Sequence, residues 1–254
     1  MPDIEIFPDP QALAQRAAEQ FAGLAEYAIR KRRRFVVALS GGSTPKQMNA
    51  LLAAPLTPLA AKINWSKVHI FWSDERCVSP ENPESNFHMT RETLLAHVPI
   101  PAGNIYRVQG EQAPEEAARR YEDTLRAFFA GQPGDTIPVG KAMRFDLILL
   151  GLGEDGHTAS LFPGDPGMRE NRRWVVSVKH STPPPPLVDR VTFTPHLINA
   201  AANVTFLVAG AAKAERLHQV LRDAYDPDRL PAQAIRPKDG KLFWFLDEAA
   251  AGKI

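Results

Sequence analysis

Three short polar segments carry the side chains best suited to chemistry, and each follows directly on an apolar run. The first is Ser40–Thr44, the second is Asp74–Arg76 and the third is Gly151–Ser160. Together they supply a glycine-rich backbone, hydroxyls, carboxylates, an arginine and a histidine. Groups of these kinds serve two purposes, the binding of a phosphate or another anion and the transfer of protons.

The first segment has the composition of an anion-binding loop. Its glycines let backbone N–H groups approach an anion, its hydroxyls add donors, and the helix predicted after it contributes partial positive charge. Thr44 is expected to be the N-cap of that helix, with Pro45 at its first position. A turn that needs only glycine and a cap explains the same pattern. A nucleotide P-loop is excluded because no Gly-Lys-Ser/Thr follows, and the candidate phosphate-binding residues are Ser40, Gly41, Gly42, Ser43 and Thr44.

The second segment places three consecutive charges, Asp74, Glu75 and Arg76, at the end of an apolar run. In isolation such a triplet is more simply interpreted as a solvated turn. A role is suggested because the triplet, like the other two segments, follows a predicted strand, and the three should meet at the ends of these strands.

The third segment contains a G-x-G-x-x-G pattern, which on its own is weak evidence for a dinucleotide site. We reject that interpretation because Glu154 and Asp155 would lie where a pyrophosphate must approach, and Pro163 would end the following helix almost at once. Asp155-Gly156-His157 at the end of a strand instead indicates a histidine held by turn geometry and available for acid–base work near neutral pH.

The remaining reactive side chains are interpreted as structural. Cys77 is more simply a small residue beside the charged turn than a nucleophile, and no G-x-S-x-G elbow of a serine esterase is present. The same structural interpretation applies to the other histidines, which are His69, His88, His97, His180, His196 and His218.

Apolar runs that alternate with amphipathic helices must position these segments. Helices are expected over residues 11–34, 86–96, 114–130 and 212–223, and strands over residues 35–39, 68–72, 145–150, 174–178, 191–194, 204–208 and 242–246. Continuous apolar strands separated by helices predict an α/β fold, a three-layer αβα sandwich with a mainly parallel sheet. Residues 1–254 are expected to form one domain, with room for a small lobe around 160–190. Ligands bind outside the carboxyl ends of such strands, so the three segments should converge there.

Composition excludes several classes of protein. The 254 residues carry 30 Lys and Arg against 29 Asp and Glu, a formal charge of +1, so no basic face for nucleic acid or a membrane surface is indicated. A single cysteine excludes an internal disulfide framework and a Cys-rich metal site. No signal peptide and no run of about 18 apolar residues is found, so a reducing, cytoplasmic setting is expected.

Taken together, the segments resemble the 6-phosphogluconolactonase family, which shares a superfamily with glucosamine-6-phosphate deaminase/isomerase. The matching stretches fall in order over nearly the whole chain, and they are Ala38–Pro45, Phe71–Val78 with Asn82 and Ser85–Phe87, Phe145–Gly164, Arg190–Thr194 and Gly210–Ala214.

The resemblance implies hydrolysis of 6-phospho-D-glucono-1,5-lactone to 6-phosphogluconate in the oxidative pentose phosphate pathway, with no obligatory cofactor or metal, by a monomer or small homo-oligomer. It also implies the deaminase fold. Carried over residue by residue, the Ser40–Thr44 loop would hold the phosphate with help from Lys213 and Arg190. His157 would be the general base, Asp74 and Asp155 its polar surroundings, and Arg76 a substrate clamp.

One stretch departs from the family pattern. The proline-rich segment Ser181–Arg190 is slightly long and lacks the lysine common there, and Lys179 is a poor substitute in register. Two alternatives stay open: a glucosamine-6-phosphate deaminase/isomerase-like enzyme, in which Asp74 would abstract a proton, and a non-catalytic sugar-phosphate-binding protein.

Overall fold

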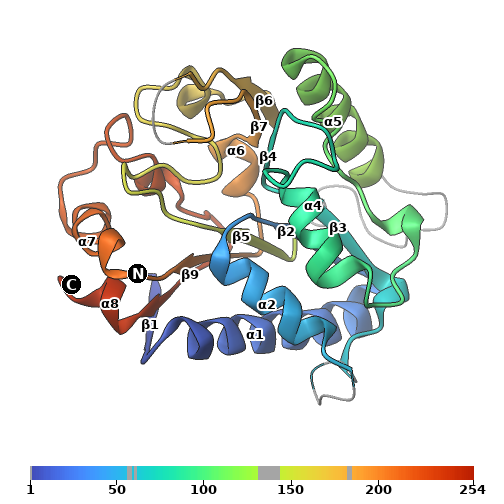
Figure 1. Ribbon diagram of the computed structural model, residues 1–254. Helices are drawn as coiled ribbons and strands as arrows, with labels where there is room; N and C mark the ends of the chain where they lie inside the picture. Colours follow the sequence, from blue (N-terminus) through green and yellow to red (C-terminus); the bar gives the residue numbers. More distant parts are fainter. Residues whose placement is uncertain (1, 56–58, 60–61, 131–143, 182–184) are drawn as a thin grey trace.

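A six-stranded parallel sheet forms the centre of the molecule (Figure 1). The computed structural model describes residues 2–55, 59, 62–130, 144–181 and 185–254. All neighbouring strands of this sheet pair in parallel. Their spatial order is β1 (Asp3–Phe7), β9 (Lys241–Asp247), β8 (Asn203–Val208), β5 (Leu147–Leu150), β2 (Phe35–Leu39) and β3 (Val68–Trp72).

The inner strands confirm the expectation from the apolar runs. Every residue of β2 and of β5 is buried, because both faces of the sheet are covered. A strand covered on both sides loses the alternation of apolar and polar residues that a half-exposed strand shows. The edge strand β1, which the sequence analysis did not predict, exposes both of its isoleucines, Ile4 and Ile6.

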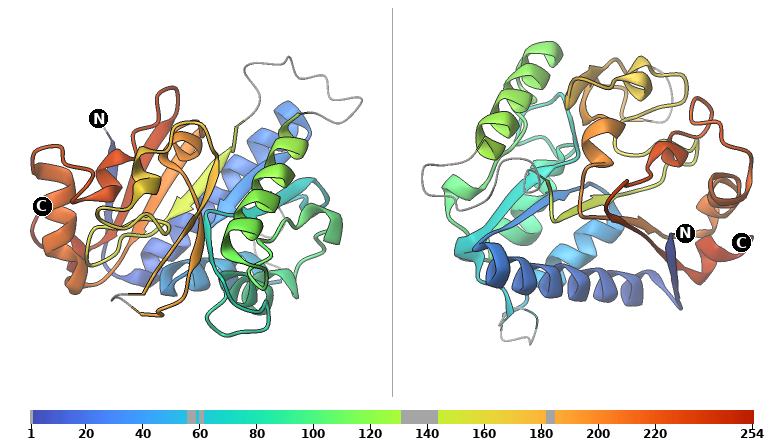
Figure 2. Two further views of the ribbon diagram at one scale, coloured as in Figure 1. Left: turned by 90° about the horizontal axis from the view of Figure 1, so that it is seen from above. Right: turned by 180° about the vertical axis from the view of Figure 1, so that it is seen from behind.

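Two layers cover this sheet, one on each face (Figure 2). The first consists of α1 (Pro10–Arg32), α2 (Ser43–Ala53) and the helical stretch formed by α4 (Asn86–Thr90) and Arg91–Leu95, which pack on the odd-numbered side chains of β2. The second contains α5 (Pro114–Phe129), α7 (Ala214–Arg222) and the short helices α6 (Pro195–Ile198) and α8 (Glu248–Ala251). The α/β class and the mainly parallel sheet are thus as predicted. Within the parts of the chain that are described, no helix is long and apolar enough to cross a membrane.

The second layer also contains a small antiparallel sheet, and this differs from the prediction. Its strands are β4 (Asp74–Arg76), β7 (Arg190–Phe193) and β6 (Val175–Val178), in that order. The runs at 174–178 and 191–194 were expected as strands of one mainly parallel sheet. They form instead an antiparallel pair with each other, and β7 pairs on its other side with the charged triplet β4, which follows β3 after Ser73.

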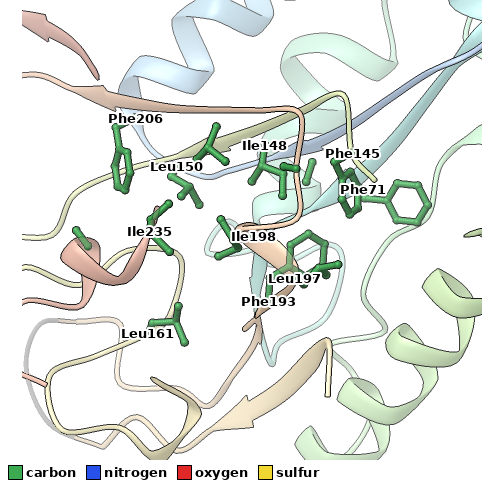
Figure 3. Packing of buried hydrophobic residues seen from close by; sticks show 14 of the residues in the cluster. Phe71, Phe145, Ile148, Leu150, Leu161, Phe193, Leu197, Ile198, Phe206 and Ile235 are labelled. Carbon is green, nitrogen blue, oxygen red and sulfur yellow. The ribbon is translucent and has the colours of Figure 1, made fainter. Parts of the chain in front are cut away.

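Apolar side chains fix this small sheet against the central one. Ile148 and Leu150 of β5 belong to the same apolar core as Phe193 of β7, and Leu161 from the loop that follows β5 reaches this core too (Figure 3). At the end of β3, the buried hydroxyl of Tyr121 accepts from the Trp72 N–H at 2.8 Å and donates to the Trp72 carbonyl at 3.0 Å. The strand end that leads into Asp74 is therefore held by α5.

Candidate active site

The three polar segments meet at one cavity of about 620 Å³ at the carboxyl ends of the central strands. This confirms the convergence that the parallel sheet predicts. The predicted site residues that line it are Ser40, Gly41, Gly42, Ser43, Thr44, Asp74, Arg76, His157 and Lys213. Further lining comes from Pro45, Asn86, Gly151, Leu152, Gly153, Glu154, Ala159, Pro185, Leu207, Val208 and Ala209.

The Ser40–Thr44 loop presents unused hydrogen-bond donors to this cavity. Helix α2 begins at Ser43, and its N-cap Gly42 has a φ of 113° and provides no side-chain cap. The expectation that Thr44 is the N-cap was therefore wrong by two residues, because glycine alone adopts this backbone conformation without strain. The buried Ser40 hydroxyl finds no hydrogen-bond partner among the described residues. An uncapped helix start beside an unpaired hydroxyl is suited to an anion.

Gly41 is required by its contact with Asn86. A Cβ at position 41 would lie 2.0 Å from Asn86 Oδ1. The amide of Asn86 in turn donates to the Asp74 backbone carbonyl at 2.9 Å. Asn86 thus ties the first polar segment to the second, a role that spacing in the sequence did not reveal although the residue lies in a stretch that resembles the family.

We expect Gly41→Ala to lower kcat/KM by about tenfold or more, because the new methyl group displaces Asn86 and breaks its hydrogen bond within the site. Gly103→Ala is the matched control, since a Cβ there meets nothing within 4 Å. Steady-state kinetics of both variants test this. Equal kinetics for the two would show that the Gly41–Asn86 contact does not shape the site.

The charged triplet divides between the two sides of β4, as the period of two in a strand requires. Asp74 and Arg76 face the cavity. Glu75 points away, and its buried carboxylate accepts from the N–H groups of Asn86 at 2.7 Å and Phe87 at 2.8 Å. Burial raises the pKa of Glu75 in spite of these hydrogen bonds. Glu75 is therefore a brace for the start of α4, whereas Asp74 belongs to the site.

Asp74 is held in place by the third segment. Its Oδ2 accepts from the Ser160 hydroxyl at 2.6 Å, and its Oδ1 lies 3.4 Å from the Asn86 amide nitrogen. The carboxylate is almost fully buried. Ser160 was not predicted as a site residue; nothing in the spacing of residues 74 and 160 shows that they meet.

His157 has the geometry of an oriented base. Its Nδ1 lies 2.5 Å from Asp155 Oδ1, the same oxygen that accepts from the His157 backbone N–H at 3.1 Å. Burial alone would raise the pKa of Asp155, but the hydrogen bond and charge of His157 outweigh it and the pKa lies below its ordinary value. With the Nδ1 proton donated to Asp155, a neutral ring carries its lone pair on Nε2.

The loop around His157 is shaped by glycine and an aromatic ring. A Cβ at Gly153 would lie 2.1 Å from His157 Nδ1, so only glycine leaves room for the imidazole. The ring of Phe162 packs on His157 with 4.7 Å between centroids. Gly151–Gly156 is not followed by a helix, the next helical turn being Pro166–Arg169. This agrees with rejecting a dinucleotide site, which needs a helix start at that point.

Of the three predicted cations, two line the cavity and one does not. Arg76 does so, donates to the Glu84 carbonyl, and has a buried Nε without a partner in the described part of the chain. Arg190 lies opposite Arg76 in the β4–β7 pairing, outside the lining, and donates to the Pro186 carbonyl at 2.8 Å. Burial lowers the pKa of Arg190, and the charge of Arg76 lowers it further. Lys213 lines the cavity with its Nζ 3.6 Å from Glu154 Oε1.

Of the proline-rich segment, Pro183 and Pro184 lie outside the described residues, and Pro185 lines the cavity. Within the described ranges, no group of three His, Cys, Asp or Glu side chains is placed to hold a metal ion.

Cys77 is not arranged as a nucleophile. Burial raises the pKa of its thiol to about 12, and the carboxylates of Asp189 and Glu75 add to the rise. We expect native protein at pH 8 to react with iodoacetamide about 10²–10³-fold more slowly than the same protein unfolded in guanidinium chloride, because the thiolate reacts and the thiol does not. Mass spectrometry of the alkylated protein measures this. Equal rates in the two states would contradict the burial of the thiol.

Comparison with known proteins places these features in a family context. Residues 8–244 match the family model described as glucosamine-6-phosphate isomerases/6-phosphogluconolactonase. A 6-phosphogluconolactonase from Nostoc sp. is 40% identical over 253 residues, 99% of this chain and 98% of that protein. One from Synechocystis sp. is 40% identical over 255 residues, 100% of this chain and 98% of that protein. The solved structure of 6-phosphogluconolactonase from Trypanosoma brucei matches with a TM-score of 0.84 and 30% identity, covering 100% of this chain and 99% of that one.

Proposed function

Since the chain belongs to the family of glucosamine-6-phosphate isomerases and 6-phosphogluconolactonases, we propose that it hydrolyses 6-phospho-D-glucono-1,5-lactone to 6-phospho-D-gluconate. The observation that carries the proposal is that an anion-binding loop and an oriented histidine open onto the same cavity. Its volume of about 620 Å³ is within the usual range for small-molecule sites. The two relatives at 40% identity over nearly their whole length carry the lactonase name.

The phosphate end of the substrate is assigned to the loop at the start of α2. A phosphate monoester carries a charge of about −1.5 to −2 at pH 7 and three strong acceptor oxygens. The unpaired Ser40 hydroxyl and the uncapped N–H groups of the first turn of α2 supply donors. Lys213, which lines the same cavity, supplies a positive charge. Arg190 acts from outside the lining, through its charge and its hydrogen bond to the Pro186 carbonyl.

The lactone end is assigned to His157. Its Nε2 takes a proton from a water molecule as the water oxygen attacks the lactone carbonyl carbon, and Asp155 holds the ring and stabilises the imidazolium. The bond between the carbonyl carbon and the ring oxygen then breaks, and the imidazolium returns its proton to that oxygen, which becomes the 5-hydroxyl. Arg76 faces the negative charge that develops on the carbonyl oxygen. The new carboxylic acid ionises and releases one proton to solvent.

We propose the cytoplasm as the compartment in which the protein acts. The chain has a single cysteine and therefore no second cysteine for an internal disulfide, and a reducing compartment keeps the residue as a thiol.

The proposal is tested by base consumption at constant pH with freshly generated lactone, corrected for spontaneous hydrolysis. Catalytic amounts of protein should accelerate the release of one proton per lactone opened. Ammonia release from glucosamine 6-phosphate, without faster lactone loss, would instead support the deaminase alternative, in which Asp74 abstracts a proton. Binding of 6-phosphogluconate with neither activity would support a silent sugar-phosphate-binding protein.

A further inference from the structure

Glu154 forms an ion pair with Lys213, the lysine assigned to phosphate binding. Both Glu154 and Lys213 line the cavity, and Lys213 Nζ lies 3.6 Å from Glu154 Oε1. The lysine side chain is 26% exposed, whereas that of Glu154 is 69% exposed. The carboxylate of Glu154 is therefore paired with Lys213, the cation that the proposed function assigns to the phosphate of the substrate.

The backbone on both sides of this ion pair is fixed. The Glu154 carbonyl accepts from Arg216 Nε at 2.9 Å, and the Gly153 N–H donates to the His157 carbonyl at 2.8 Å. On the other side, the Gly210 N–H that starts the turn of Lys213 donates to the Asp247 carboxylate at 3.0 Å. The mostly exposed side chain of Glu154 can thus turn away from Lys213 while the backbone that carries His157 stays in place.

We propose that Glu154 is an internal competitor for the phosphate site, which pairs with Lys213 when the site is empty and is displaced by the phosphoryl group. The inference rests on the proposed function for the identity of the anion, but it requires only that a phosphate binds at the Ser40–Thr44 loop and Lys213. An exposed ion pair is weak, and a phosphate carries about −1.5 to −2 against the single charge of a carboxylate, so the phosphate prevails. Glu154 then sets how much substrate is needed, because its displacement weakens binding and leaves the chemical step unchanged.

The test is Glu154→Gln, which keeps the shape of the side chain and removes its charge. Breaking an exposed pair is worth about two- to fivefold in affinity. We therefore expect KM for the lactone and Kd for inorganic phosphate, measured by calorimetry, to fall by about that factor, with kcat unchanged. Since salt screens charges on an exposed pair, the difference from wild type should shrink between about 0.01 M and 1 M ionic strength.

Two further variants make the test specific. Glu19→Gln removes one negative charge from an exposed position on α1, where its carboxylate accepts from Gln15, and should change neither constant. In a Lys213→Ala background most of the benefit of Glu154→Gln should disappear, because the cation with which Glu154 pairs is gone. An unchanged or raised Kd for phosphate in Glu154→Gln, or an equal benefit in the Lys213→Ala background, would overturn the inference. Binding of inorganic phosphate requires only the Ser40–Thr44 loop and Lys213. A wild-type protein that binds phosphate but leaves the lactone intact would therefore overturn the proposed function, and phosphate binding by the variants would still test the role of Glu154.

Discussion

His157→Ala is expected to lower kcat for lactone hydrolysis by about 10²–10⁴-fold, which is the usual contribution of a positioned general base. The variant removes the ring whose Nε2 takes the water proton, and it leaves Asp155 without its partner at 2.5 Å. KM should stay within a few-fold of wild type, since the phosphate loop and Lys213 are on other segments. Initial rates of base consumption, corrected for spontaneous hydrolysis, measure both constants.

A matched control separates this loss from a general effect of removing an imidazole. His97 is exposed and its ring forms a hydrogen bond with the backbone carbonyl of Glu92, outside the cavity lining, so His97→Ala should retain the kinetics of the wild type. The circular dichroism of both variants should match that of the wild type, because the His157 side chain lies at the cavity rather than in the core. Lactone turnover by His157→Ala at the wild-type rate would show that another group activates the water.

Arg76→Ala is expected to lower kcat by about 10²–10³-fold, the effect of removing one donor to a developing oxyanion. Arg76 is suited to this role because its buried Nε has no partner among the described residues and its side chain faces the cavity. Folding stability should not fall in parallel. Arg76 lies opposite Arg190 across β4 and β7, and like charges at opposite positions of a strand pair destabilise it.

Thermal unfolding and kinetics of the same variant test both parts of this prediction. Arg119→Ala is the control, since Arg119 lies on the exposed side of α5 and pairs with Glu116 and Asp123. A kcat near the wild-type value with a raised KM would mean that Arg76 binds the ground state and does not stabilise the transition state. A lower Tm of more than a few degrees would contradict the relief of repulsion from Arg190.

Much of the fold was accessible from sequence because its central strands are buried on both faces. Residues 35–39 and 68–72 were predicted with the bounds that β2 and β3 have in the structure. The edge strand β1 was missed because its isoleucines are exposed and no uninterrupted apolar run marks it. The three residues of β4 are all charged, and only their pairing with β7 makes them a strand.

The site was predicted as a meeting of segments, and its internal contacts were not. A parallel sheet brings strand ends together, so Asp74, His157 and the Ser40–Thr44 loop could be placed at one edge. The position of Arg190 depends on antiparallel register, which places it opposite Arg76, and it is not among the residues that line the cavity. Side-chain contacts such as Ser160–Asp74 and Lys213–Glu154 join residues far apart in the chain, and no periodicity encodes them.

One cavity is proposed to bind a phosphoryl group at one end and to activate water for the lactone at the other. Comparing kcat/KM for 6-phosphogluconolactone and for gluconolactone, which lacks the phosphate, tests this proposal most directly. Hydrogen bonds to a charged group contribute about 1.5–3 kcal/mol each, so loss of the phosphate should lower kcat/KM at least about 10²-fold. Equal values for the two lactones would contradict the account, because the loop at the start of α2 would then play no part in holding the substrate.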